Sequence, residues 1–176
     1  LWLPDVFGYS AALPQILQKS GVDKFVTSKI SWNEYNKLPY DSFMWEGLDG
    51  TEVFTYFLTA RNHEKYCERD TETTYTGHVT PKMVLGTWER YQQKDYSDET
   101  IITFGFGDGG GGPTEEMLEA ARRLEYGLPG IPKTQMSFAG DFLKRVKDNF
   151  DKNCEITGRT PKWVGELYLE FHRGTY

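Results

Sequence analysis

Residues 100–126, TIITFGFGDGGGGPTEEMLEAARRLEY, join an apolar run to a helical pattern through four consecutive glycines. The run at 100–106 predicts a strand that is apolar enough to be buried on both faces. Residues 114–126 predict a helix that ends at Gly127. One face of this helix carries the apolar residues Met117, Leu118, Ala121 and Leu124. A strand, a tight turn and a helix in this order form the repeating unit of an α/β fold.

The rest of the chain continues the alternation of strands and helices. Further strands are predicted at 1–6, 24–30, 43–46, 52–58, 134–138 and 163–171. Helices are predicted at 11–19, from Thr80 onward and at 140–150, with Thr80 as N-cap and Pro81 in the first helical position. Gly50 marks a turn between 43–46 and 52–58, and 61–79 reads as a long polar loop. The pattern predicts one α/β domain with a parallel sheet or barrel.

Composition narrows the class of partner. The 176 residues carry a net charge of −6, and the mean hydropathy is −0.61. Nucleic acid and anionic membrane both need basic surfaces, so neither is expected as a partner. No apolar run approaches the roughly 20 residues of a membrane span. Cys67 and Cys154 form no CxxC motif, which favours reduced thiols in a cytoplasmic protein and leaves a disulfide open.

Two aspartates lie at the ends of predicted strands: Asp5 closes the first strand in WLPDVFG, and Asp108 follows the strand ITFGFG. In α/β folds the chemistry collects at the carboxyl ends of the strands. Two carboxylates on one rim can serve as nucleophile and general acid on a glycosidic bond, about 5–5.5 Å apart in retaining enzymes. A capping or turn role is the simpler reading of either residue alone. The glycines after Asp108 let the backbone pass close to a ligand.

A nucleotide site is the competing reading of the glycines. The string GFGDGG at 105–110 fits GxGxxG in form, after a predicted strand and before a predicted helix. However, its fourth residue is Asp108, whose charge repels phosphate. No lysine follows the glycines, as a P-loop requires. The pattern therefore favours a ligand other than phosphate, while a nucleotide-binding α/β domain remains an alternative.

Four stretches together identify a family. WLPDVFGYSAALPQIL, TSKISWNEYNKLPYDSFMWEGLDGTEV, FGFGDGGGGPT and ELYLEFHRGTY resemble the α-mannosidases of glycoside hydrolase family 38, most closely the bacterial and fungal-type branch. The resemblance spans nearly the whole chain. It implies that residues 1–176 are a central fragment of the catalytic domain, truncated at both ends. It also implies a partial parallel β/α barrel, as a segment of a seven-stranded barrel-like domain.

The resemblance assigns roles to individual residues. Asp5 matches the aspartate that is both catalytic nucleophile and zinc ligand, and Asp108 matches the proposed acid/base. Phe7 matches the aromatic residue that packs beside the sugar at the metal. Lys29 lies where related enzymes carry a basic residue near the nucleophile. The implied reaction is zinc-dependent, retaining hydrolysis of α-mannosidic bonds in a mannose-containing oligosaccharide.

Other polar and aromatic residues are candidates from residue type alone. Trp32, Trp45 and Trp88 could stack on sugar faces, although helical spacing favours a core position for Trp88. Asn33, Asn62 and Arg61 could bind sugar hydroxyls from rim loops. Glu115, Glu116, Glu119, Arg122 and Arg123 predict a solvated helix face with i,i+4 ion pairs.

The zinc site is incomplete in this sequence. The family pattern places a His-x-Asp pair before Asp5 and a further histidine after Tyr176. His63, His78 and His172 have no ligand spacing, and solvated or structural roles are the simpler reading. A non-catalytic carbohydrate-binding or interaction fragment is therefore the main alternative. The open edges of a cut barrel also make a homo-oligomer possible.

Overall fold

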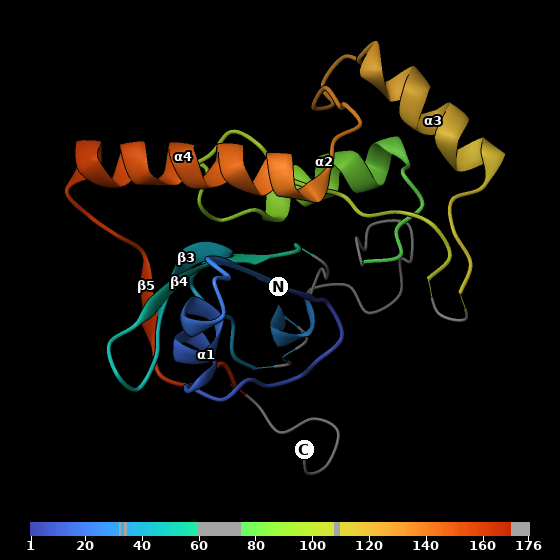
Figure 1. Ribbon diagram of the computed structural model, residues 1–176. Coiled ribbons are helices and arrows are strands. Elements are labelled where there is room, and N and C mark those ends of the chain that lie inside the picture. The colour runs from blue at the N-terminus through green and yellow to red at the C-terminus, as the bar shows by residue number, and fades with distance from the viewer. Residues whose placement is uncertain (32, 34, 60–74, 108–109, 170–176) are drawn as a thin grey trace.

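A computed structural model describes residues 1–31, 33, 35–59, 75–107 and 110–169 (Figure 1). The strands are β1 (Trp2–Leu3), β2 (Lys24–Thr27), β3 (Ser42–Glu46), β4 (Glu52–Phe57) and β5 (Lys162–Val164). The helices are α1 (Leu13–Lys19), α2 (Pro81–Arg90), α3 (Glu115–Glu125) and α4 (Ala139–Thr157), with a 3-10 turn η1 (Lys29–Ser31) after β2. The predicted α/β class is confirmed.

The five strands form one mixed sheet in the order β1-β2-β4-β3-β5. β1, β2 and β4 are parallel, whereas β3 runs antiparallel to β4 and parallel to β5. The β3–β4 connection is a tight hairpin in which Gly50 adopts φ +80°. A parallel pair needs a crossover of about a dozen residues, so this short turn forces the antiparallel pairing. The prediction of a parallel sheet is therefore wrong for β3 against β4, and the partial barrel is not confirmed.

Helices cover both faces of the sheet, with α2 and α4 on one side and α1 on the other (Figure 1). Strand residues alternate between the two layers, as the period of two requires. Phe25, Phe43 and Trp45 pack toward α1 in one core cluster. Val26, Phe54 and Tyr56 pack toward α4 in a second cluster. The sheet is therefore buried on both faces. Each strand residue must face one core cluster or the other, so the direction of the side chains up to the end of each strand is fixed.

Several predicted elements differ from the structure. Among the residues that the structure describes, 100–106 take part in one isolated bridge, Gly77 with Phe104, and form no strand, and Phe106 is 54% exposed. Residues 134–138 are not a strand either, and Phe138 is 83% exposed. Apolar composition suggested strands in both places, but a strand also needs a partner along its length.

Other predicted boundaries shift. β1 covers two residues of the predicted 1–6 and lies partly exposed at the sheet edge, and β2 ends at Thr27 instead of residue 30. β5 (Lys162–Val164) begins one residue before the predicted strand 163–171 and ends at Val164, and residues 170–171 of that prediction lie outside the described residues. α4 is longer than predicted, at 19 residues.

The helix starts follow the sequence signals. Thr80 accepts a hydrogen bond from the backbone N–H of Met83, and Thr114 accepts one from Met117, so both N-caps form. α3 packs Ala121 and Leu124 in a small cluster with Val84 of α2.

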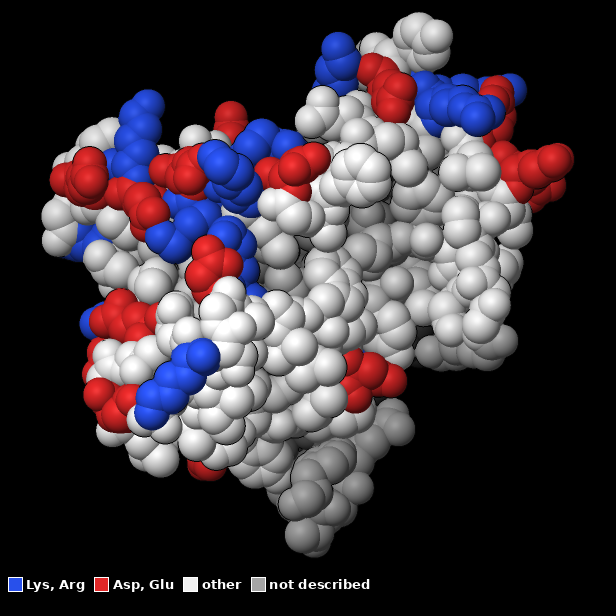
Figure 2. Space-filling model, in the orientation of Figure 1, with Lys and Arg blue, Asp and Glu red and all other residues white. Residues whose placement is uncertain are grey.

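Charged side chains of both signs alternate over α4 and α3 on the face drawn in Figure 2. Three i,i+4 ion pairs lie on these helices: Arg123 with Glu119, Lys144 with Asp148 and Lys147 with Asp151. The first of them confirms the predicted pairing on α3. Within the described part of the chain, no helix has the length and apolar character to cross a membrane.

Candidate functional site

An ion pair joins the ends of the first two parallel strands. The Lys29 Nζ atom lies 3.1 Å from Oδ1 of Asp5. Asp5 follows β1 and Lys29 follows β2, whose last residues, Leu3 and Thr27, are register partners. The side chain of Lys29 is only 9% exposed, whereas that of Asp5 is 57% exposed. A buried ammonium therefore contacts a carboxylate that remains open to solvent.

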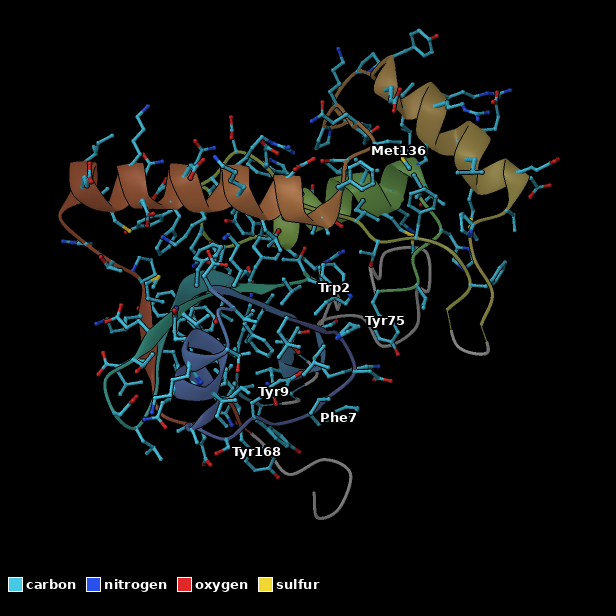
Figure 3. The ribbon with its side chains drawn as sticks, in the orientation of Figure 1. Trp2, Phe7, Tyr9, Tyr75, Met136 and Tyr168 are labelled. Carbon is cyan, nitrogen blue, oxygen red and sulfur yellow. The ribbon has the colours of Figure 1, made fainter. Side chains whose placement is uncertain are left out.

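Two aromatic rings also lie close to the Lys29 ammonium. The Nζ atom lies 5.6 Å from the ring centre of Phe7 and 5.0 Å from that of Tyr75. Phe7 and Tyr75 both lie to the right of the sheet in Figure 3. The electron-rich ring faces stabilise the ammonium, and the carboxylate balances its charge. We call Asp5, Phe7, Lys29 and Tyr75 the Asp5–Lys29 cluster.

The structure thus brings together three of the residues singled out from the sequence, Asp5, Phe7 and Lys29. Tyr75 was missed because the polar loop that contains it has no periodic pattern. An aromatic residue in such a loop was the only signal that could have indicated it. Two other candidates, Trp32 and Asp108, lie outside the described residues.

Asn33 is not on an exposed rim. Its side chain is buried, and its amide nitrogen donates a hydrogen bond to the carbonyl of Ile30 in η1. This bond fixes the turn directly after Lys29. Trp45 is also buried, with 0% exposure, and its indole N–H donates to the carbonyl of Gly165 at 2.6 Å. Stacking of a sugar on Trp45 is therefore excluded in this fold.

The glycine loop lies next to the segment that carries Tyr75. The Gly105 N–H donates to the carbonyl of Gly77, and the Gly77 N–H donates to that of Thr103. The imidazole of His78 packs edge to face on Phe106, with 5.5 Å between ring centres. The segment 75–78 therefore contacts Lys29 through Tyr75 and the start of the glycine loop through its backbone.

A metal site does not assemble from these residues alone. Among the residues that the structure describes, no group of three His, Cys, Asp or Glu side chains could hold a metal ion. Asp5 is the single carboxylate of the cluster, and a tetrahedral zinc site takes three or four protein ligands. His78 contacts Phe106, which agrees with a structural role. His63 and His172 lie outside the described residues.

Comparison with known proteins gives consistent matches. Residues 1–166 match the family model described as the glycosyl hydrolases family 38 N-terminal domain. The chain is 39% identical over 175 residues to Alpha-mannosidase G of Dictyostelium discoideum, covering 99% of this chain and 14% of that protein. It is 40% identical over 184 residues to an α-mannosidase of Saccharomyces cerevisiae, covering 99% of this chain and 15% of that protein.

A solved structure supports the fold. The crystal structure of an α-mannosidase from Enterococcus faecalis matches with a TM-score of 0.63 and 19% sequence identity, covering 94% of this chain and 17% of that one. At this identity the likeness concerns the fold alone. The chain spans 14–15% of the length of these two curated relatives.

Proposed function

The chain belongs to glycosyl hydrolase family 38, and from this we propose that it forms part of the catalytic domain of an α-mannosidase. The reaction proposed is hydrolysis of α-mannosidic bonds in a mannose-containing oligosaccharide, with retention of configuration. The observation that carries the proposal is the Asp5–Lys29 pair at the carboxyl ends of β1 and β2. A solvent-facing carboxylate held by a buried cation is suited to attack on a sugar.

In the first step a carboxylate oxygen of Asp5 forms a bond to the anomeric carbon as the glycosidic C–O bond breaks. Asp108 gives its proton to the leaving oxygen. In the second step Asp108 takes a proton from water, which attacks the same carbon and releases Asp5. Lys29 holds one oxygen of Asp5 through the 3.1 Å contact and so orients the carboxylate.

The aromatic residues of the cluster are proposed to contact the substrate. Phe7 is half-buried and lies two residues beyond Asp5, and its ring centre is 5.6 Å from the Nζ atom of Lys29. Apolar ring faces suit the C–H faces of a sugar, while Asp5 and Lys29 supply the polar contacts. Trp32 remains a candidate for stacking. Asn33 already uses its amide nitrogen on Ile30, which weakens its candidacy as a hydroxyl donor.

Zinc is proposed as the cofactor, with Asp5 as one ligand. The described residues do not fit a complete zinc site, because no three His, Cys, Asp or Glu side chains among them come together and zinc takes three or four protein ligands. When bound, zinc supplies positive charge for sugar hydroxyls. No step above depends on it, and chelation tests the requirement directly.

A cytoplasmic location is also proposed. Cys154 is a free thiol, which agrees with a reducing compartment. The possible homo-oligomer remains a prediction.

The test is hydrolysis of an aryl α-mannoside by the intact enzyme that carries this segment, with and without a chelator. Asp5→Asn should lower kcat by about three orders of magnitude or more, because the nucleophile is lost. Asp23→Asn is the matched control, since Asp23 pairs with Lys24 at the opposite end of β2. It should change kcat less than about twofold.

Activity of Asp5→Asn above about a tenth of wild type would remove Asp5 from the nucleophile role, since a tenfold loss is only about 1.4 kcal/mol. Binding of mannose oligosaccharides without any hydrolysis would instead favour the non-catalytic alternative. Full activity in the presence of chelator would reject the zinc proposal and leave the carboxylate chemistry intact.

A further inference from the structure

Tyr9 is buried beneath the Asp5–Lys29 cluster and contacts both strands that carry the ion pair. Its side chain is 7% exposed, and its ring packs edge to face on Phe25 with 4.8 Å between ring centres. In Figure 3 it is drawn between α1 and Phe7. Neither the sequence patterns nor the reaction steps above give this residue a role.

The phenol oxygen bridges the ends of β1 and β2. It donates to the carbonyl of Leu3 at 2.8 Å and lies 2.7 Å from Oγ1 of Thr27. A phenol has one proton, so with that proton on Leu3 the hydroxyl of Thr27 donates to the phenol oxygen. Burial, the largest cause, raises the pKa of Tyr9 to about 12, so the phenol keeps its proton in ordinary assay buffers.

The two residues that Tyr9 connects are the last register pair of the β1–β2 ladder. That ladder has only two such pairs, Trp2 with Val26 and Leu3 with Thr27. Beyond it the chains continue directly to Asp5 and Lys29, each two residues further on. The end of β2 is held on its other side by β4, where the Leu58 N–H donates to the carbonyl of Thr27 at 2.9 Å, whereas toward β1 the ladder stops at Leu3 and Thr27. The phenol supplies a side-chain connection at that point.

We propose that Tyr9 is a positioning residue, which fixes the separation of Asp5 and Lys29 by joining Leu3 to Thr27. It acts through these strand ends and does not touch the substrate. The inference rests on the proposed function for its catalytic consequence, since that function assigns Asp5 to attack. Loss of the phenol hydroxyl leaves the ring in place and loosens the carboxylate relative to the ammonium. Misplacement of a nucleophile affects the chemical step more than binding.

The first experiment compares Tyr9→Phe with Tyr91→Phe in the intact enzyme, using an activated aryl α-mannoside. Tyr91 is the matched control because it is also buried, has a pKa raised to about 12 by burial, and pairs with Ser42 at 2.8 Å on the other core layer. Tyr9→Phe should lower kcat about 10- to 100-fold and change KM less than threefold. Tyr91→Phe should stay within threefold of wild type in both. Equal effects of the two variants would overturn the proposal.

Variants of Thr27 separate the hydrogen bond from packing. Thr27→Val keeps the volume and loses the hydroxyl, so it should lower kcat as Tyr9→Phe does, and the double variant should be no worse than either. Thr27→Ser keeps the hydroxyl and loses a methyl group, so it should retain kcat within threefold. If Ser is the worse substitution, packing is the role of this contact and the proposal fails.

A measurement without substrate separates this inference from the proposed function. In hydrogen exchange on the same proteins, Tyr9→Phe should speed exchange in peptides that cover residues 1–8 and 24–31, and leave residues 40–46 unchanged. Tyr91→Phe should do the reverse. If the wild-type enzyme hydrolyses no mannoside, the proposed function fails, while faster exchange at these strand ends still supports the Tyr9 connection. Unchanged exchange there overturns it.

Discussion

Gly105 is a position in the glycine loop that should tolerate no side chain. It adopts φ +119° and is buried at the start of the loop. A Cβ atom added there would lie 2.7 Å from the backbone nitrogen of Pro113 and 2.8 Å from the carbonyl carbon of Gly112. Both neighbours are backbone atoms, so neither can turn away as a flexible side chain would. Gly105→Ala should therefore force the loop to open.

The cost can be estimated from two terms. An L-residue in such a backbone region costs about 1–3 kcal/mol. Relief of the two backbone overlaps costs about as much again, as in overpacked cores. Replacement of glycine by alanine also stabilises by about 0.4–1 kcal/mol through the unfolded chain. Gly112→Ala shares this last term, has no positive φ and meets no atom within 4 Å, so it is the matched control.

Urea unfolding of the two variants, followed by tryptophan fluorescence, gives the difference directly. The free energy of unfolding of Gly105→Ala should be lower than that of Gly112→Ala by at least about 2 kcal/mol. The amide hydrogen of Phe106, which donates to the carbonyl of Gly112 at 3.0 Å, should also exchange faster. Unfolding free energies within about 0.5 kcal/mol of each other would refute the reasoning.

Two further predictions concern carboxyl groups. Burial raises the pKa of Asp41 to about 6, despite a hydrogen bond from the Gln92 N–H. The stability that the folded state gains from protonated Asp41 is therefore present below pH 4 and is lost as pH rises through 6. The free energy of unfolding of Asp41→Asn should therefore rise relative to that of wild type by about 3 kcal/mol between pH 4 and pH 8. A difference between the two proteins that stays constant over this pH range in urea unfolding would contradict this. Asp108→Ala should slow mannosides with poor leaving groups far more than activated aryl mannosides, and equal loss in steady-state assays would remove Asp108 from the acid role.

The local signals of the sequence predicted local structure well. Thr80 and Thr114 begin helices because the side-chain oxygen of each accepts a hydrogen bond from the unpaired backbone N–H three residues further on, a contact that depends on nearby residues alone. Gly50 closes the β3–β4 hairpin for a similarly local reason. The prediction of a strand at 100–106 was wrong because pairing depends on which segment lies alongside, and within the described part of the chain that is a single bridge from Gly77 to Phe104. Apolar composition reports burial and says little about partners.

Only part of the candidate site could be predicted, because some of its residues come from segments whose neighbours the sequence does not reveal. Asp5 could be found because it closes a predicted strand, and the ends of parallel strands meet on one rim, whereas Lys29 was indicated only by the family resemblance, since it lay inside the predicted strand 24–30. Tyr75 reaches the cluster from a segment whose position depends on the glycine loop, so no pattern in its own neighbourhood indicated it. Asn33 was expected on an exposed rim, but the turn that follows β2 buries it.

The register of β1 against β2 determines whether the proposed nucleophile has a cationic partner at all. Leu3 pairs with Thr27, so Asp5 and Lys29 are equally far beyond the ladder and their side chains meet at 3.1 Å. A slip of one residue would move Lys29 by about 3.3 Å along the strand and turn the side chains of β2 to the opposite face. Phe25 and Val26 belong to different core clusters, so a slip would move each side chain into the other cluster and disrupt the packing of both. Core packing on the two faces of β2 therefore selects the register that brings carboxylate and ammonium together.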